Sequence, residues 1–411
     1  MWTNTLYILF VIALSFGGNL HYGFLTPRQI VAVFMFFITL RNLNFLKPYY
    51  KTFFLLYSAY LFILFWASFF DGTLNNYCRS FISQHMVAMV SFGSFIVYYA
   101  KKRTFVPIFI TFIVCGFLNS IVCLLQYSGN PLGFTIGSLF ISETDVMANN
   151  HMEHLMEGTG TYLLGMKGDA VHNGEFMMMM PFLLAYVRDK YKEAKQFNAI
   201  GNILYYCLLC LFFITILLIQ ERSCILLSIF FYILYLWKTL SKISISKKML
   251  LAIILPFILL LGYLYVEPYI LDYIVNSRFE SQDNSTRKKL LHNSLEFIGN
   301  HFFMGSMNQF LRENSFRPHN ILLNAFVETG FFGFIMALIL YFKQIRSACK
   351  LALLKDTSVI VFAFITCTSN SLFHNDSILT GDVYIWVLWG CLLCYKYEKY
   401  SKGSKLKYKK K

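Results

Sequence analysis

A single histidine at the start of an apolar segment is the residue of this sequence that best suits proton-transfer chemistry. His319 lies in Arg317-Pro318-His319-Asn320, where a polar stretch leads into a run of apolar residues. An imidazole exchanges a proton near neutral pH, so one interpretation is a catalytic base. The other is that this stretch only caps a helix, with glycines further along for packing.

Two glycines follow in the same apolar segment, at Gly330 and Gly333. If one helix continues through them at about 100° per residue, both lie within about 40° of the direction of His319. A face with so little side chain allows another helix to approach closely. Glu328 is an ionisable residue in apolar surroundings, so it needs a partner or a water-filled cavity.

The composition places these residues in a membrane protein. Hydrophobic residues make up 57% of the 411 residues, and charged residues only 14%. A soluble domain of this length cannot bury so much apolar surface. We therefore predict an all-α polytopic membrane protein, a single transmembrane domain over 1–411 with about 12 transmembrane helices. The apolar segments are 4–20, 26–43, 52–70, 83–100, 104–126, 174–190, 200–219, 223–240, 248–267, 320–342, 357–373 and 382–397.

The positions of Lys and Arg predict the orientation. With the N-terminus in the cytoplasm, the inner connections and the basic tail at 397–411 hold most of the 36 Lys and Arg residues. Cytoplasmic loops carry such an excess, so both termini are predicted to be cytoplasmic. The first segment lacks a basic leader and a small-residue cleavage pattern, so it is not expected to be a cleaved signal.

Two predicted outer loops are long, at 127–173 and 268–319. Binding or catalysis on the outer side of the membrane is therefore expected in these loops. The second is predicted to be the large periplasmic loop and to contain amphipathic helical structure. Cations gathered on the side that normally has few of them predict an anionic ligand. The basic residues of this loop are Arg278, Arg287, Lys288, Lys289, Arg312 and Arg317.

Two arginines have both a functional and a structural interpretation. The pattern at 286–300 predicts an amphipathic helix, and Arg287 points along the middle of its apolar side, which is marked by Leu290, Leu291, Leu295 and Ile298. Arg287 is thus placed to bind an anion at the membrane interface, or only to anchor the helix to lipid headgroups. Arg222 lies in the short outer turn 220–223, where it reaches a ligand or pairs with Glu221.

The first long loop contains a group of potential metal ligands. His151, His154 and Glu157 are spaced by three residues, as on one side of a helix, and this spacing suits a metal ion. No further ligand follows at a recognisable spacing. The sequence therefore predicts no metal and no other cofactor.

The pattern His319-Asn320, nine residues, then Gly330-x-x-Gly333 resembles the signature of the O-antigen ligase and polymerase family. Arg222-Ser223 at the outer end of a span and the Arg278 to Arg287 loop resemble further features of that family, in the same order. The resemblance covers about 200–345. It implies a bacterial inner-membrane glycosyltransferase that moves a glycan from undecaprenyl diphosphate to a sugar hydroxyl at the periplasmic face, without a metal.

The resemblance also implies roles for individual residues. His319 would accept or orient the proton of the attacking hydroxyl, while Arg222 and Arg287 grip the diphosphate leaving group. The polyprenyl tail would lie against the face formed by Gly330 and Gly333. The expected partners are the lipid-linked donor, a glycan or lipid A-core acceptor and the bilayer, with no nucleic acid. Further expected substrate contacts are Arg278, Arg317, Asn320 and Glu328.

Several functions stay open at this point. Polymerases of O-antigen, capsule or other surface polysaccharide use the same donor and motif as lipopolysaccharide O-antigen ligases, so the motif does not separate them. The competing class is a multi-span polysaccharide flippase or transporter. A transporter predicts ionisable residues near the middle of the membrane and two similar halves. Neither feature is visible in the sequence.

Overall fold

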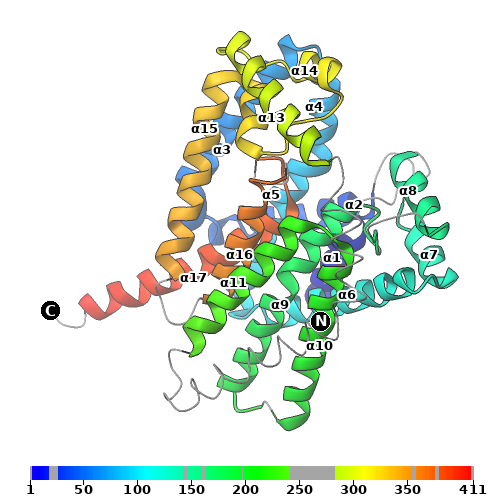
Figure 1. The fold of residues 1–411 in the computed structure, drawn as a ribbon. Helices are drawn as coiled ribbons and strands as arrows, with labels where there is room; N and C mark the ends of the chain where they lie inside the picture. The colour runs from blue at the N-terminus through cyan, green and yellow to red at the C-terminus, as the bar shows by residue number, and fades with distance from the viewer. Residues whose placement is uncertain are drawn as a thin grey trace.

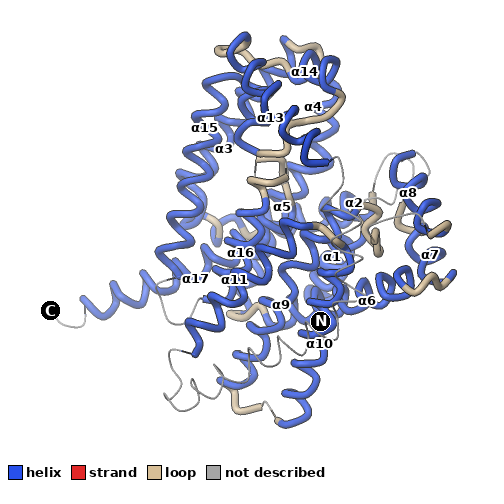
Figure 2. The backbone as a smooth tube through the Cα atoms, in the orientation of Figure 1, coloured by secondary structure: helices blue, strands red, loops and turns tan. Residues whose placement is uncertain are grey.

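The structure is a computed structural model, and it describes residues 2–17, 26–141, 146–158, 163–196, 198–240, 283–352, 358–374 and 379–408. Within these ranges all regular elements are helices joined by loops and turns (Figure 2). The predicted all-α class is confirmed for this part of the chain. The helices of the first half are α1 (Trp2–Phe16), α2 (Pro27–Arg41), η1 (Leu43–Phe45), α3 (Lys47–Phe70), α4 (Leu74–Ser80), the π-helical turn η2 (Phe81–Met86), α5 (Val87–Lys102), α6 (Val106–Tyr127), α7 (Pro131–Ser138), α8 (Val146–Met156) and α9 (Ala170–Glu193). Those of the second half are α10 (Ala199–Ile219), α11 (Arg222–Leu240), α13 (Asp283–Asn300), α14 (Met307–Asn314), α15 (Ile321–Ala352), α16 (Ser358–Asn370) and α17 (Val383–Tyr408).

The apolar segments predicted from the sequence coincide with helices. Each predicted span overlaps a described helix except 248–267, which lies outside the described residues. Among the described residues, the helices long and apolar enough to cross a membrane are Phe53–Phe70, Leu74–Lys102, Val106–Tyr127, Ala199–Ile219 and Ile321–Leu351. Shorter apolar helices are Asn4–Phe16, Val359–Asn370 and Val383–Tyr395. The chain is therefore a helical membrane protein.

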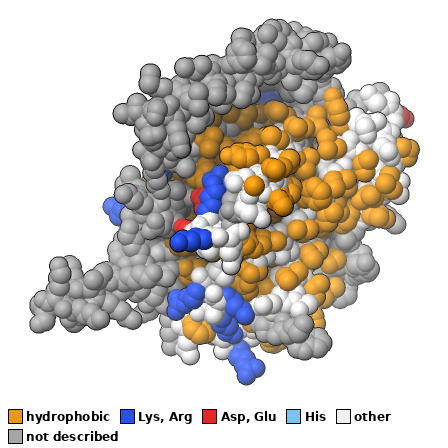
Figure 3. Space-filling model, turned by 90° about the horizontal axis from the view of Figure 1, so that it is seen from below, with side chains coloured by type: hydrophobic (Ala, Val, Ile, Leu, Met, Phe, Trp, Pro, Cys, Tyr) orange, Lys and Arg blue, Asp and Glu red, His pale blue; other side chains and the backbone are white. Residues whose placement is uncertain are grey.

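Helix α9 is at the centre of the bundle. Helices α6, α10, α11 and α16 pack against it, and its residues 173–186 are all buried. On the other side, α5 packs against α2 and α17, and α15 lies beside α3 (Figure 1). Apolar side chains also cover much of the surface seen from below, with Lys and Arg gathered on one part of it (Figure 3). Such an apolar exterior suits contact with lipid.

Helices α13 and α14 lie together with α4 at one end of the molecule (Figure 1). They enclose a small core of their own, formed by Leu290, Phe297, Met307, Phe310 and Val327. Asp71, just after α3, accepts a hydrogen bond of 2.8 Å from the backbone N–H of Asn308 and another from Ser306 Oγ. The loop segment is thereby joined to the helical bundle.

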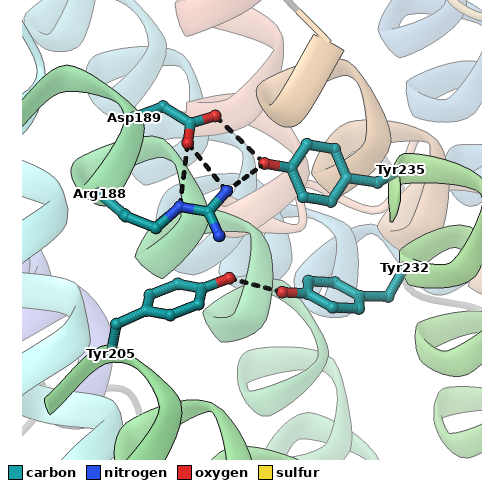
Figure 4. Close-up of polar contacts among 5 residues, drawn as sticks. All are labelled: Arg188, Asp189, Tyr205, Tyr232 and Tyr235. Carbon is teal, nitrogen blue, oxygen red and sulfur yellow. Dashed lines mark hydrogen bonds and ion pairs between the residues drawn. The ribbon is translucent and has the colours of Figure 1, made fainter. Parts of the chain in front are cut away.

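A polar cluster joins α9, α10 and α11 at the ends remote from the α10–α11 turn (Figure 4). The Arg188 guanidinium donates to Asp189 Oδ1 over 2.8 Å and to the Tyr235 hydroxyl over 2.9 Å. The same guanidinium lies 4.4 Å from the ring centre of Tyr205, whose hydroxyl is 2.7 Å from that of Tyr232. With a carboxylate and an aromatic face as partners, Arg188 has a structural role.

Helix α15 is broken at Gly330, so the prediction of one continuous helix through both glycines is wrong. Gly330 has φ 70° and ψ −164°, a region that glycine alone adopts readily. The loop between α13 and α14 lies against the break, where the backbone N–H of Phe331 donates to Phe302 O over 2.9 Å. A Cβ on Gly330 would lie only 2.6 Å from the carbonyl carbon of Phe303. The break leaves the backbone N–H of Phe331 available to the Phe302 carbonyl, and this hydrogen bond holds the loop between α13 and α14 close to Gly330.

The position of Gly333 changes for the same reason. A helical wheel counted from His319 loses its phase at the break. A Cβ on Gly333 would meet the side chain of Thr329, which lies just before the break. The predicted face of two glycines that another helix or a lipid tail approaches is therefore not formed.

Candidate active site

His319 lines a pocket of about 230 Å³ between α13, the start of α15 and the end of α16. Helix α13 contributes Leu290, Leu291 and Ser294 to it, and Leu323 lines the pocket from α15. The imidazole is exposed rather than packed into the core. The pocket is lined mainly by apolar side chains, and Ser294, His319 and Asn320 are its polar members.

Asn320 fixes the position of this histidine. Its Oδ1 accepts hydrogen bonds from the backbone N–H groups of Leu322 at 2.9 Å and Leu323 at 3.2 Å, as a helix N-cap. Its Nδ2 donates to Leu372 O over 3.0 Å. Both ends of the amide, predicted to contact substrate, are thus used on the backbone, and Asn320 joins α15 to the end of α16.

His374 is the residue of this site that the sequence did not reveal. Its ring centre lies 6.4 Å from that of His319, with the planes at 83°. Its Nε2 is 3.0 Å from Glu221 Oε1 and 3.0 Å from Ser223 Oγ, and the side chains of His374 and Glu221 are 5% and 6% exposed. A carboxylate only accepts hydrogen bonds, so Nε2 carries a hydrogen when it bonds Glu221. The only signal in the sequence was that His374 precedes an asparagine, as His319 does.

Arg222 begins α11 between these two partners of His374. Its side chain is half-buried, whereas Glu221 and Ser223 are buried. Glu221 Oε1 also binds His374, so this carboxylate links the turn to the second histidine. Arg222 thus lies in a turn in which the side chains of Glu221 and Ser223 contact His374, the histidine beside His319.

A buried polar layer lies next to this turn. Asn370 of α16 donates from Nδ2 to Glu175 Oε1 of α9 over 2.9 Å, and its backbone carbonyl accepts from the His374 N–H over 3.0 Å. Cys224 Sγ lies 3.9 Å from Asn370 Oδ1. These bonds connect α9, α11 and α16 behind the two histidines. Buried polar networks of this kind hold a site in one geometry when their members are satisfied.

Two predicted arginines are described incompletely or not at all. Arg278 lies outside the described residues. Arg287 is in α13, but its side chain is also outside what the structure describes. Arg287 precedes Ser294 by two helical turns, which puts the two positions within about 20° of each other on the helix. Helix α13 thus carries the position of Arg287 as well as Ser294, which lines the His319 pocket.

The apolar side of α13 differs from the prediction. Leu290 and Phe297 are buried, whereas Leu291 and Leu295 are 48% and 55% exposed. The buried side is turned toward Met307 and Phe310 of α14 because these side chains complete the small core. The sequence pattern alone could not show which leucines α14 would cover.

Arg317 and Glu328 line a neighbouring pocket of about 240 Å³ instead of the His319 pocket. This central pocket lies between α3, α4 and α14, and Tyr60 and His85 also line it. Glu328 thus meets the predicted need for a polar cavity. It does not share a pocket with His319, because the helix turns these two side chains to different sides.

Of the potential metal ligands in the first long loop, His151 and His154 are on α8 and Glu157 follows its end. His154 Nδ1 and Glu157 Oε2 are 3.8 Å apart, with side chains 62% and 68% exposed. In the part of the chain that the structure describes, no group of three His, Cys, Asp or Glu side chains is close enough to hold a metal ion. The two short helices α7 and α8 replace an extended loop there.

Comparison with known proteins identifies the same region. Residues 207–338 match the family model described as O-antigen ligase. The match includes α11, α13, α14 and the first part of α15, and so all the elements that carry Arg222, Arg287 and His319. No curated protein matches the chain. Over this segment, the match confirms the resemblance to the O-antigen ligase and polymerase family that the histidine and glycine motif predicted.

Proposed function

We propose that this protein transfers a glycan from undecaprenyl diphosphate to an acceptor sugar hydroxyl at the periplasmic face of the bacterial inner membrane, without a metal. The acceptor is a second lipid-linked glycan in a polymerase, or the lipid A core in a ligase. The proposal includes twelve spans, both termini in the cytoplasm and the 268–319 loop in the periplasm. In this orientation the His319 pocket faces the periplasm.

One observation carries the proposal, namely the convergence of separate elements on the His319 pocket. His319 shares this pocket with residues of α13, the helix that also carries Arg287. The ring of His374 lies beside His319 and binds both chain neighbours of Arg222. Helix α13, the start of α15 and the end of α16 thus meet at His319, and the turn that carries Arg222 contacts the neighbouring His374.

The chemistry follows from these residue types. The acceptor hydroxyl oxygen bonds to the anomeric carbon of the donor sugar, and the bond from that carbon to the phosphate oxygen breaks. Undecaprenyl diphosphate leaves with the electron pair, while His319 takes the hydroxyl proton. Negative charge develops on the leaving diphosphate, and the planar guanidinium groups of Arg222 and Arg287 match its oxygens.

The test is turnover of purified protein with a lipid-diphosphate glycan and an acceptor, with and without a chelator. We expect His319→Ala and Arg287→Ala to lose at least about 100-fold in rate, the effect of removing a general base or a charge-stabilising donor. Arg312→Ala is the matched control, since Arg312 is exposed on α14 and lines neither the His319 pocket nor the central pocket. Full activity in His319→Ala or in Arg287→Ala refutes the role assigned to that residue. Loss of activity with the chelator refutes metal independence.

The same preparation separates the competing class. In vesicles, a flippase moves the lipid-linked glycan across the bilayer without extending or transferring it. Movement without transfer in the wild-type protein would favour that alternative. Supplying either a second lipid-linked glycan or a lipid A core as acceptor then distinguishes polymerase from ligase.

A further inference from the structure

The central pocket of about 240 Å³ has no assigned role in the transfer at His319. It lies between α3, α4, η2, α14 and the first part of α15, at the end of the molecule where α4 and α14 meet (Figure 1). Its lining combines a few polar groups with apolar and aromatic side chains, a mixture that is typical of small-molecule sites. The polar side chains used below are Tyr60, Tyr77, His85, Arg317 and Glu328.

Glu328 offers hydrogen-bond acceptors to this pocket. Within the part of the chain that the structure describes, its carboxylate makes no hydrogen bond and no ion pair. An ionised carboxylate has about four acceptor sites, and it is costly to leave them unused away from bulk water. These sites are therefore available to the hydroxyl groups of a ligand.

Arg317 offsets the charge of Glu328 without occupying its oxygens. The guanidinium group lines the same pocket and stabilises the charged carboxylate electrostatically, while the carboxylate of Asp71 acts in the opposite direction. A lining that contains both signs of charge disfavours ions, because a diphosphate is repelled by Glu328 and an ammonium group by Arg317. An uncharged polar ligand is favoured instead.

Two tyrosines contribute aromatic surface to the lining. Tyr60 is 2% exposed, and its hydroxyl makes no hydrogen bond to a residue of the described ranges. Its hydroxyl also lies within the electrostatic influence of Glu328 and Arg317. The Tyr77 hydroxyl donates to Leu61 O over 3.1 Å, which fixes the Tyr77 ring in the wall of the pocket. A phenol combines an apolar ring with a polar end, and so suits a sugar ring, which has both kinds of surface.

His85 lies in the π-helical turn η2, inside the long helical segment Leu74–Lys102. Single π-helical turns within α-helices are frequent at functional sites. The Tyr57 hydroxyl is 2.6 Å from His85 Nδ1 and orients the ring, whereas Nε2 has no hydrogen-bond partner in the described chain. The turn before α17 packs closely here, since a Cβ on Gly381 would lie 2.9 Å from the His85 backbone nitrogen. The imidazole is thus held in place in the wall of the pocket.

The central pocket adjoins the pocket of His319 through a short segment of chain. Arg317 lines the first and His319 the second, with Pro318 between them in sequence. The Cα atoms of Arg317 and His319 are at most about 7 Å apart, because two residues cannot span more. A glycan with one sugar unit in the central pocket can therefore place a neighbouring unit near His319.

We propose that the central pocket binds an uncharged, hydroxyl-bearing sugar unit of the acceptor glycan, with Glu328 accepting hydrogen bonds from its hydroxyl groups. This inference rests on the proposed function for the origin of the sugar, whereas binding of a free sugar is measurable without catalysis. Tyr60 and His85 would contact the same unit. The donor diphosphate, which Glu328 repels, would occupy the separate pocket beside α13.

The test is saturation-transfer NMR on the purified full chain in a zwitterionic detergent, which has no sugar headgroup to compete. The probes are glucose, galactose, mannose, rhamnose and N-acetylglucosamine, each titrated separately. We expect saturable binding of at least one sugar, weakened at least about 10-fold in Glu328→Gln, because a charge-assisted acceptor is lost at nearly constant size. Tyr60→Phe, which removes only the hydroxyl, should weaken it about 2- to 10-fold, as for one neutral hydrogen bond. Glu296→Gln is the matched control, since Glu296 is exposed on α13 and lines neither pocket.

Other outcomes would overturn the inference. Absence of saturable binding of all five sugars to the wild type contradicts the site, and so does unchanged affinity in a folded Glu328→Gln variant. If thermal unfolding shows that Glu328→Gln does not fold, unchanged affinity in Tyr60→Phe decides against the site. Binding of glucosamine but of none of the five neutral sugars would assign the pocket to an ammonium group instead.

Turnover separates this inference from the proposed function. His319→Ala should lose transfer but keep sugar binding, so lost transfer with intact binding in the wild type concerns the proposed function alone. Where transfer is measurable, Glu328→Gln should raise the KM for the acceptor at least about 10-fold and leave the KM for the donor unchanged. A raised donor KM with an unchanged acceptor KM would contradict the assignment to the acceptor.

Discussion

Replacing Gly330 by Ala tests how the family motif shapes this site. In the backbone region of Gly330, φ 70° and ψ −164°, a residue with a side chain is less stable by about 1–3 kcal/mol. The new Cβ would also lie 2.6 Å from the Phe303 carbonyl carbon, where ordinary contact begins at 3.4 Å, so the loop must move by the difference, about 0.8 Å. Such overpacking adds about 1–3 kcal/mol. We expect a total destabilisation of about 2–6 kcal/mol.

Thermal unfolding of the purified protein in detergent and turnover with a lipid-diphosphate glycan give the two readouts. The midpoint of Gly330→Ala should fall by several degrees. Its turnover should fall as well, because the displaced loop leads through α14 to His319. Gly299→Ala is the control: Gly299 is exposed in α13 and a Cβ there meets nothing within 4 Å, so stability should stay equal or rise. If both variants match the wild type, the broken-helix geometry is wrong.

Three further substitutions test the connections around the site. Glu221→Gln removes the charged partner of His374. The transfer rate should fall about 10- to 100-fold, because a hydrogen bond to a charged group is worth about 1.5–3 kcal/mol. The pH–rate profile should also change, and an unchanged profile would mean that the Glu221–His374 pair has no role in proton transfer. Asn320→Ala loses the cap of α15 and should destabilise the protein by about 0.5–2 kcal/mol in thermal unfolding, whereas no change would show that the cap is dispensable. Asp71→Asn weakens two bonds to the start of α14, so limited proteolysis should cut this segment faster, and equal cutting would contradict its anchoring role.

Sequence patterns predicted the helical membrane class because lipid imposes a strong local constraint. A spanning segment must be apolar over about 20 residues and must satisfy its backbone hydrogen bonds internally. Helices such as Val106–Tyr127 and Ala199–Ile219 therefore follow from composition alone. The spacing of His319, Gly330 and Gly333 was likewise enough to predict the family that matches 207–338.

The neighbours of each site residue could not be predicted in this way. His374 lies 55 residues after His319 and 153 after Glu221, and contacts at such separations depend on how α11, α15 and α16 pack. The break at Gly330 was also hidden, because a glycine permits a positive φ without requiring one. Arg317 and Glu328 were predicted to bind substrate together with His319. They line a different pocket, because closeness in sequence does not determine which pocket a side chain lines.

The sequence by itself determined the helical membrane class of this protein and its resemblance to the family that matches 207–338, because hydropathy and short motifs depend on residues close together in the chain. Tertiary structure alone decided that a loop rather than a helix meets Gly330, that Glu221 serves His374, and that His85 and Glu328 share a pocket. These outcomes depend on the packing of distant segments, because buried donors and acceptors bind the partners that the surrounding helices bring within reach.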